Sequence, residues 1–424
     1  MMRAGFAEID ITPPIGTHKI GWLVDIVSDR VADPLFARAA IFDDGAQAVG
    51  FIQTDTLCVR WSTVKEIRAR IERAYGFPGG AVMVAATHNH AGPAVATAGE
   101  VRRDDAYVER FIEACVKAFG EALEGLREAQ VGFGHTFEWN VAHNRRVVMR
   151  DGTTRTHGSF KDPDALYIEG PIDPEVAVLA ARAGDGTPLG CIINFACHPA
   201  HHGPDTVLSA GFPGVVAAKM KAKGWPVTLY LNGASGNLHT SDPTRGGIDL
   251  SMEETGAALA RDAEQVIADM TFTRDATLAA RSRTVMLPFR TITEDEVRGT
   301  ARGAQRFVKP ELYDELMPGL VARIRAQGEQ PAEVQVLSVG EVDFVGIPAE
   351  YFVEHGLRIK EGAHPRHALV VGQANGMVGY VPTQQAFRRG GYETTFAPSS
   401  RLAPEAGDIL ADAAIALIKE RGRG

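Results

Sequence analysis

The sequence of 424 residues has few of the features that mark specialised classes of protein. Its only cysteines are Cys58, Cys115, Cys191 and Cys197, and their spacing forms no CxxC pattern of the kind that binds zinc or carries out redox chemistry. It lacks charge runs, Gln/Asn tracts and Ser-rich linkers, so its composition indicates no disordered segment. No apolar run reaches the length of a membrane span or of a signal-peptide core. We therefore expect a folded protein with buried free thiols, located in the cytoplasm.

An excess of positive charge is also missing. The formal net charge is -9, and basic residues form only short stretches such as "NRRVVMR". This balance argues against a nucleic-acid partner and against stable association with an acidic membrane. The sequence does not decide the oligomeric state, and a homo-oligomer remains an open alternative.

Several catalytic signatures are absent as well. The sequence has no HExxH zinc motif and no Gly-Lys-Ser/Thr phosphate loop. The stretch "NGASGN" is similar to the GxSxG turn of serine hydrolases, but Asn237 stands where the last glycine would be. A serine hydrolase with Ser235 as its nucleophile is therefore an alternative hypothesis only.

Strand and helix patterns alternate along the chain. This alternation predicts an α/β fold with mixed β-sheets flanked by helices. Residues 33–52 and 173–192 share Asp-Pro, an apolar run and an Asp-Gly turn, which favours a duplicated supersecondary unit. Chance similarity is the alternative, because Asp-Gly hairpins are common. No long linker divides the chain, so we expect residues 1–424 to form a single catalytic domain.

Histidines follow two apolar strands. "VMVAATHNH" places His88 and His90 two residues apart, and in a strand such residues point to the same side. "NFACHPA" places His198 at the end of a second strand. Hydrolytic zinc sites take three protein ligands and leave one position open, so two strand ends with histidines favour a metal site. The alternative is that each imidazole only packs or hydrogen-bonds.

A carboxylate and a phenol complete the set of candidates. Glu350 in "GIPAEYF" follows a buried strand where a helix begins, so it is either a metal ligand or a capping residue. Tyr380 in "GMVGYVPT" follows a strand and a glycine turn, where a tyrosine commonly packs with its hydroxyl in water.

The motifs taken together resemble those of the neutral/alkaline non-lysosomal ceramidase family, in its N-terminal catalytic domain. The matching stretches occur in family order over nearly the whole chain, and they include "AGFAEIDITPPIG", "DPLFARA", "THNHAGP", "NRR", "NFACHPA", "NGASGN", "IPAEYF" and "NGMVGYVPT". The resemblance implies hydrolysis of a linear N-acyl amide bond by metal-activated water.

The resemblance also implies the site residues. One zinc per chain is held by His88, His198, Glu350 and Tyr380, and His90 lies beside the metal and protonates the departing amine. Glu350 shares the proton of the water, and Tyr380 or His90 stabilises the oxyanion, so these three residues are the expected catalytic groups.

Departures from the family pattern affect the expected substrate. Pro-Ala-Glu replaces Pro-Gly-Glu before Tyr351, and Gly211 and Asn237 stand near positions where relatives often have an acidic residue. Secreted relatives have an export signal and a C-terminal immunoglobulin-like domain, neither of which we expect here. We therefore predict a small soluble amide as substrate, with the polar segment 135–161 as a roof over the pocket. A true ceramidase, a metal-dependent esterase or lactonase, and a non-catalytic binding protein remain alternatives.

Overall fold

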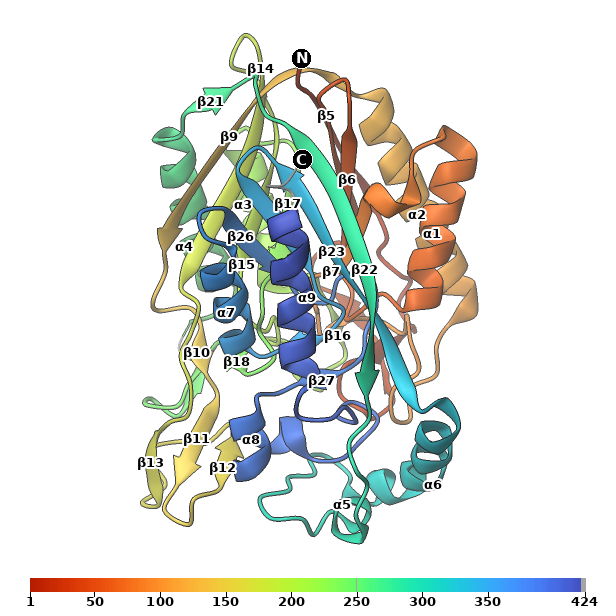
Figure 1. The fold of residues 1–424 in the computed structure, drawn as a ribbon, viewed down its shortest axis with the longest axis vertical. Coiled ribbons are helices and arrows are strands. Elements are labelled where there is room, and N and C mark those ends of the chain that lie inside the picture. The colour runs from red at the N-terminus through yellow and green to blue at the C-terminus, as the bar shows by residue number, and fades with distance from the viewer. Residues whose placement is uncertain (249, 421–424) are drawn as a thin grey trace.

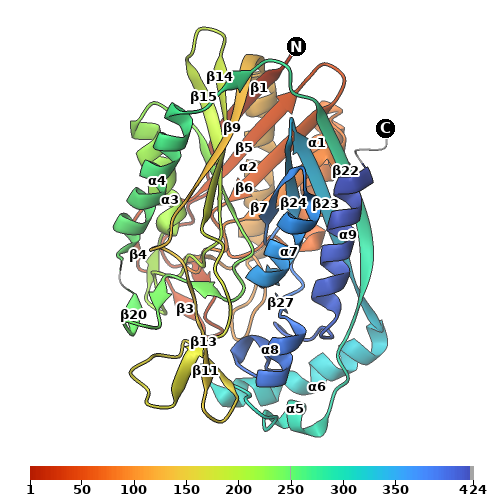
Figure 2. The same cartoon turned by 60° about the vertical axis from the view of Figure 1, so that its left-hand side comes forward.

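Two β-sheets pack face to face, and helices cover the outer face of each (Figures 1 and 2). The structure is a computed structural model, and it describes residues 1–248 and 250–420. The resulting order of layers is helices, nine-stranded sheet, four-stranded sheet, helices. The predicted fold class, mixed sheets flanked by helices, is confirmed.

The larger sheet has the strand order β17-β15-β14-β9-β1-β5-β6-β7, with β21 paired to β9. Its two halves meet where β1 and β9 begin, at the pairs Arg3 with Glu128 and Ala4 with Arg127. Its strands are β1 (Arg3–Asp10), β5 (Phe36–Asp43), β6 (Ala48–Thr54), β7 (Val82–Ala86), β9 (Arg127–Phe137), β14 (Glu175–Ala183), β15 (Pro188–Phe195), β17 (Thr228–Asn232) and β21 (Phe272–Thr273).

The smaller sheet has the order β22-β23-β24-β26. Its strands are β22 (Leu278–Pro288), β23 (Glu329–Val339), β24 (Val342–Gly346) and β26 (His367–Val371). The helices that flank the two sheets are α1 (Trp61–Tyr75), α2 (Asp105–Glu124), α3 (Gly211–Ala222), α4 (Met252–Ala268), α7 (Val353–Ala363) and α9 (Ala406–Glu420).

One supersecondary unit occurs three times in the described part of the chain. Each unit has three antiparallel strands, a crossover helix, a fourth strand parallel to the third, and a closing helix. The units are β1-β5-β6-α1-β7-α2, β9-β14-β15-α3-β17-α4 and β22-β23-β24-α7-β26-α9. The predicted repeat at 33–52 and 173–192 falls on the equivalent hairpins β5-β6 and β14-β15, and the third copy has no matching sequence signal.

The direction of the strands positions the functional end of each unit. The first, third and fourth strands run the same way, so their carboxyl ends lie at one edge. After the first strand of every unit comes an insertion, formed by residues 11–35, 138–174 and 289–328. The insertions and the loops after the third and fourth strands therefore gather together, which is where ligands bind in open α/β sheets.

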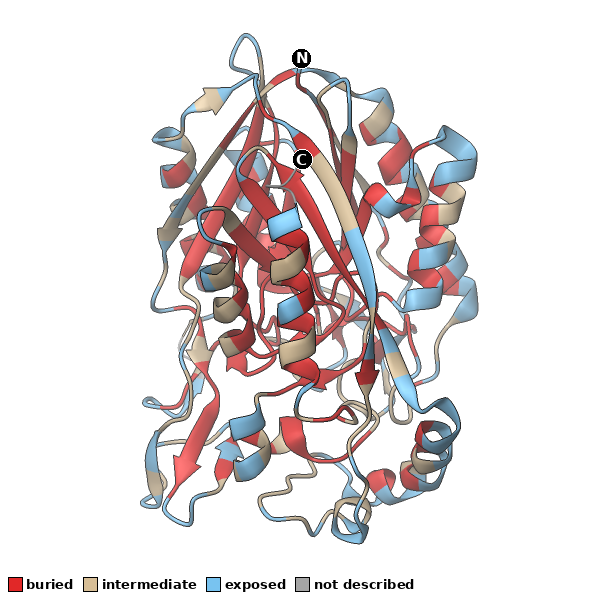
Figure 3. Cartoon of the chain, viewed as in Figure 1, coloured by how far each residue is buried: buried red, intermediate tan, exposed pale blue. Residues whose placement is uncertain are grey.

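Successive side chains along the strands point to opposite faces of the large sheet, and both faces are buried in the core. Ile41 and Ile52 face helices α1 and α2, while Phe42 and Phe51 face the second sheet. Across that sheet-to-sheet interface the Phe51 and Phe344 rings pack edge to face, with centroids 4.9 Å apart. Figure 3 shows the buried residues concentrated in the strands and on the inner faces of the helices.

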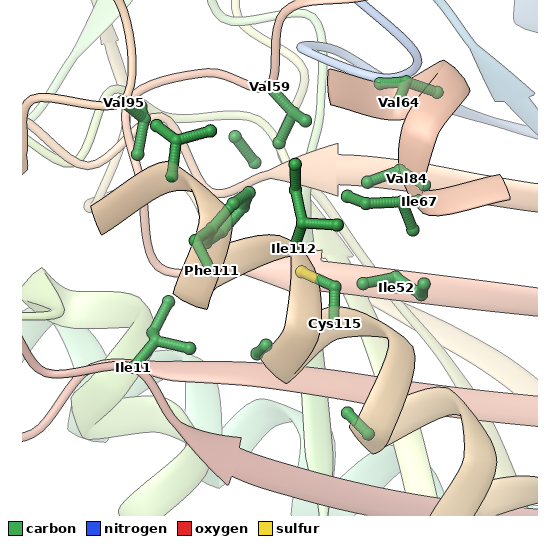
Figure 4. Packing of buried hydrophobic residues seen from close by; sticks show 14 of the residues in the cluster. Ile11, Ile52, Val59, Val64, Ile67, Val84, Val95, Phe111, Ile112 and Cys115 are labelled. Carbon is green, nitrogen blue, oxygen red and sulfur yellow. The ribbon is translucent and has the colours of Figure 1, made fainter. Parts of the chain in front are cut away.

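The α2 helix buries the apolar side chains of one of its faces against the large sheet. Phe111, Ile112 and Cys115 share one face of the helix and lie over Ile52 and Val84 of the sheet (Figure 4). All four cysteines are free and buried, as predicted. No helix in the described ranges is long and apolar enough to span a membrane.

The insertions and loops contain the remaining short elements. Residues 130–170 hold the end of β9 and a small sheet of order β12-β11-β13. The remaining elements are β2 (His18–Ile20), β3 (Ile26–Val27), β4 (Arg30–Val31), η1 (Gly79–Ala81), β8 (Gly92–Pro93), β10 (His143–Asn144), β11 (Arg146–Met149), β12 (Thr154–Thr156), β13 (Ala165–Ile168), β16 (Val207–Leu208), β18 (Leu238–His239), β19 (Ser241–Asp242), β20 (Gly247–Ile248), α5 (Glu294–Arg298), α6 (Pro310–Gln327), β25 (Glu350–Tyr351), β27 (Tyr380–Val381), α8 (Gln384–Arg389) and η2 (Tyr392–Thr394).

Candidate metal centre

The four predicted metal ligands come from all three units and meet at one buried point. His88 follows β7 and His198 follows β15, so the two histidines follow a fourth and a third strand and are not equivalent in the repeat. Glu350 and Tyr380 begin β25 and β27, and they stand opposite each other in that short parallel pair. All four side chains are buried.

The donor atoms of three of these residues converge. The Nε2 atoms of His88 and His198 are 2.9 Å apart. Glu350 Oε2 lies 3.3 Å from the Nε2 of His88 and 3.7 Å from that of His198. These separations are close to those between ligands that share one small metal ion.

Backbone carbonyls fix the tautomers of the two imidazoles. The Nδ1 of His88 lies 3.0 Å from the Leu57 carbonyl oxygen, and the Nδ1 of His198 lies 2.9 Å from that of Ser235. A carbonyl oxygen only accepts, so each Nδ1 is the protonated nitrogen and each neutral ring directs its Nε2 lone pair inward. Two lone pairs and a carboxylate oxygen that face one another repel unless a cation lies between them. The donor set therefore fits a divalent metal.

The electrostatics of the pocket keep His198 and His90 neutral, and a neutral imidazole is the form that can bind a metal. Burial and the nearby positive charge of Arg145 lower the pKa of His198 well below its ordinary value. Burial and His88 lower the pKa of His90 in the same direction.

His90 lies beside the pair, but a turn rather than a strand brings it there. The β7 strand ends at Ala86, and His88 has a left-handed backbone with φ of 68°. The expectation that His88 and His90 share a strand face is therefore wrong, because the strand ends before the first histidine. The turn nevertheless places the His90 Nε2 3.2 Å from that of His88, and the Trp22 indole donates to the His90 carbonyl at 3.1 Å.

Arg145 connects Tyr380 to the rest of the site, and its one sequence signal is the matching stretch "NRR". Its Nη2 donates to the Tyr380 hydroxyl at 3.2 Å, and its guanidinium lies over the Tyr380 ring at 5.7 Å. Its Nε donates to the buried carboxylate of Glu393 at 2.9 Å. Burial and the neighbouring Glu350 carboxylate raise the pKa of Tyr380 well above its ordinary value.

Ser235 lacks the surroundings of a nucleophile. Its hydroxyl accepts from the Asn232 side chain at 3.2 Å, and its carbonyl holds His198. Among the described residues no histidine, lysine or carboxylate hydrogen-bonds this hydroxyl, and a nucleophilic serine needs such a base. The serine-hydrolase alternative finds no support in the geometry.

The two departures at Gly211 and Asn237 lie outside the pocket lining. Gly211 begins α3 with φ of 69°, a conformation that favours glycine. Asn237 accepts from the Val353 backbone N–H and donates to Glu354, both at 2.9 Å, so it fixes the start of α7.

A pocket of about 330 Å³ opens onto the centre and is lined by His88, His90, Glu350 and Tyr380 among other residues. Most of the other lining residues come from the first and third insertions, from the loop after β6, and from residues 96–99, 377–379 and 397–401. The predicted roof 135–161 contributes no lining residue, so that prediction is wrong. Residues of α6, in the third insertion, line the pocket instead.

A second cluster of similar chemistry, formed by His135, Glu175 and His367, lies elsewhere. Glu175 Oε1 lies 2.8 Å from His135 Nδ1 and 2.6 Å from His367 Nε2, and Lys360 donates to Glu175 Oε2 at 2.7 Å. A lysine ammonium already neutralises this carboxylate, so the cluster is an ion-pair network between the two sheets.

Comparison with known proteins agrees with the motifs. No family model matches the chain. The chain is 23% identical to the neutral ceramidase of Pseudomonas aeruginosa over 467 aligned residues, which cover 90% of this chain and 67% of that protein. The chain is therefore similar to a neutral ceramidase over most of its length.

Two solved structures share the fold of this chain. The crystal structure of the Pseudomonas aeruginosa neutral ceramidase superposes with a TM-score of 0.75 at 20% identity, over 99% of this chain and 75% of that one. A ceramidase complexed with C2 superposes with a TM-score of 0.76 at 18% identity, over 100% and 75%. Because both superpositions cover nearly the whole chain, the shared fold includes all three repeated units.

Proposed function

We propose that the protein is a zinc-dependent hydrolase that cleaves a linear N-acyl amide bond. The observation that carries this proposal is the convergence of two imidazole lone pairs and a carboxylate oxygen at the end of a pocket. The similarity to a neutral ceramidase supports amide hydrolysis. Nitrogen and carboxylate donors with an accessible open side are what hydrolytic zinc sites use.

His88, His198, Glu350 and Tyr380 would hold the ion. When bound, zinc supplies a Lewis acid that polarises an amide carbonyl and lowers the pKa of a water molecule. Glu350 faces the same point and would serve there as the proton acceptor. The carbonyls of Leu57 and Ser235 keep both imidazoles in the orientation that the ion needs.

His90 and Tyr380 act on the substrate. His90 lies next to the ligands without a carbonyl on its Nε2, so this nitrogen can carry a proton to the departing amine. The Tyr380 hydroxyl faces the position where negative charge develops on the amide oxygen, and Arg145 donates a hydrogen bond to that hydroxyl. The buried Glu393 holds the Arg145 guanidinium in place, so the donor is preorganised for that charge.

The substrate we propose is a small amide. The pocket of about 330 Å³ is at the low end of the range for small-molecule sites. The relatives supply the second candidate, a lipid amide, because they are ceramidases and one was solved as a complex with C2. A metal-dependent esterase or lactonase would use the same residues.

Metal removal and a substrate panel test the proposal. Dialysis against a chelator should abolish amide cleavage, and one equivalent of zinc should restore it. Long-chain ceramide in detergent is then compared with short N-acyl amino acids and N-acyl amino sugars, and we expect turnover of the short amides. Cleavage of ceramide alone would contradict the small substrate, and full activity without metal would contradict the mechanism.

A further inference from the structure

Three arginines line the pocket that leads to the metal centre: Arg60, Arg323 and Arg401. They come from the start of α1, from α6 and from the loop before α9. Of the described residues that line this pocket, Glu350 at the metal centre is the sole carboxylate. The pocket is therefore locally cationic in a chain whose net charge is -9.

Arg401 is held in place without a counter-ion. One Nη atom donates to the Pro398 carbonyl at 2.5 Å, and the other donates to the Gln330 side chain at 3.0 Å. Both partners are neutral, so they fix the direction of the guanidinium but leave its charge uncompensated. Burial and the charges of Arg323 and Arg60, which line the same pocket, lower the pKa of Arg401 to about 10.

Arg60 and Arg323 are also unpaired with acids. Both are exposed at the pocket, and within the described residues neither makes an ion pair or a hydrogen bond to a carboxylate. Glu350 is not available to them, because its carboxylate faces His88 and His198. Like charges placed together raise the free energy of the folded protein unless an anion lies between them.

We infer that these three arginines bind an anionic group of the substrate, so that the preferred substrate is an N-acyl amide bearing a carboxylate or a similar anion. Guanidinium groups bind carboxylates with paired, charge-assisted hydrogen bonds. The lining of the same pocket also includes apolar side chains, among them Leu57, Leu316 and Met377. A short apolar chain with the amide at one end and an anion near the other fits this arrangement. This inference rests on the proposed function for the cleavage step, but not for the binding of the anion.

Matched substrates test the anion preference directly. N-octanoylglycine and N-octanoylethanolamine have the same acyl chain and amide, and only the first carries a carboxylate. We expect the wild-type protein to prefer N-octanoylglycine by at least roughly 10-fold in kcat/KM, because one strong ion pair is worth about that factor. Equal values for the two amides would overturn the inference and leave the proposed function intact.

Charge reversal of exposed residues avoids a folding defect. Arg323→Glu and Arg60→Glu should each remove the preference by raising KM for N-octanoylglycine, with little change for N-octanoylethanolamine. Arg325→Glu is the control, since Arg325 is exposed on the same helix and does not line the pocket. An equal loss in all three variants would mean a general charge effect and would overturn the assignment.

Binding measurements separate this inference from the proposed function. Calorimetry with His90→Ala protein compares the two compounds without requiring turnover. Tighter binding of N-octanoylglycine that Arg323→Glu abolishes would support the anion site even if no amide were cleaved. Absence of any difference in binding would refute the site whatever the activity.

Discussion

At the scale of single residues, the function depends on which nitrogen of each histidine is free. The backbone carbonyls of Leu57 and Ser235 accept hydrogen bonds from the Nδ1–H groups of His88 and His198. The Nε2 atom of each ring therefore keeps its lone pair free, and both Nε2 atoms face Glu350. A histidine held in this way already has the tautomer and the ring orientation that metal binding requires. His90 differs because its Nε2 faces His88 from the side of the pocket.

Removal of a ligand should remove the metal. His88→Ala and His198→Ala should each lose most of the bound zinc and the activity, because the remaining donors no longer surround the ion. Elemental analysis of the purified variants, with circular dichroism to check folding, measures this. If both variants keep a full equivalent of zinc, the ligand assignment is wrong.

Removal of His90 should separate binding from catalysis. We expect His90→Ala to keep most of its zinc while kcat falls by roughly 10²-fold or more, the usual effect of a positioned acid–base group. Metal content and kcat are measured on the same preparation, with His90→Gln as a variant that retains polarity. Loss of zinc together with activity would instead make His90 a ligand, which its distance of 3.2 Å from His88 allows.

At the scale of elements, the repeated β-β-β-α-β-α unit explains how distant segments build one site. Each unit directs three strand ends and one insertion to the same edge, and the ligands occupy the ends of third and fourth strands. The two sheets must stay in register for these edges to meet. Phe51 of β6 and Phe344 of β24 are among the contacts that join them.

Truncation at this interface should destabilise the fold. Phe51 is fully buried and packs against both Phe42 and Phe344. We expect Phe51→Ala to lower the free energy of unfolding by about 3–5 kcal/mol, the usual cost of removing a buried phenylalanine ring. Urea denaturation measures this, and Phe51→Leu should cost much less. A loss below about 1 kcal/mol for Phe51→Ala would show that the sheets are not held together there.

At the scale of the whole molecule, a charge network connects the large sheet to the third unit. Glu175 of β14 contacts His135 of β9, Lys360 of α7 and His367 of β26. Burial by itself raises the pKa of Glu175, but the hydrogen bond from His367 and the charge of Lys360 outweigh it and lower the pKa to about 2. The Glu175 carboxylate therefore stays ionised to a lower pH in the folded protein than in the unfolded chain.

This network should make stability fall in acid. Because the folded pKa lies below the unfolded value of 4.5, the contribution is fully present above about pH 4.5 and is lost as the pH falls towards 2. Its size is at most about 3 kcal/mol. Denaturation of wild type and Glu175→Gln between pH 2 and 6 should show curves that differ most at pH 6 and converge in acid. Parallel curves would contradict the assignment.

The sequence by itself determined the chemistry that each segment offers. Local patterns can be recognised in the sequence alone. They include the apolar runs before His88 and His198, the Asp44-Gly45 turn of the β5-β6 hairpin, and the alternation of strands and helices. The family motifs added Glu350 and Tyr380, which spacing alone leaves as a cap and a packing residue.

Only the tertiary structure decided which residues meet. Arg323 and Arg401 lie in an insertion and a loop, and nothing local distinguishes them from the other arginines of the chain, whereas Arg145 is marked by the stretch "NRR" alone. The expected roof at 135–161 failed for the same reason, because the third insertion reaches the pocket instead. The convergence of these side chains depends on how the three units pack and on which loops fill the space between them. Contacts between residues so far apart in the sequence produce no periodic pattern in it, so the sequence does not predict them.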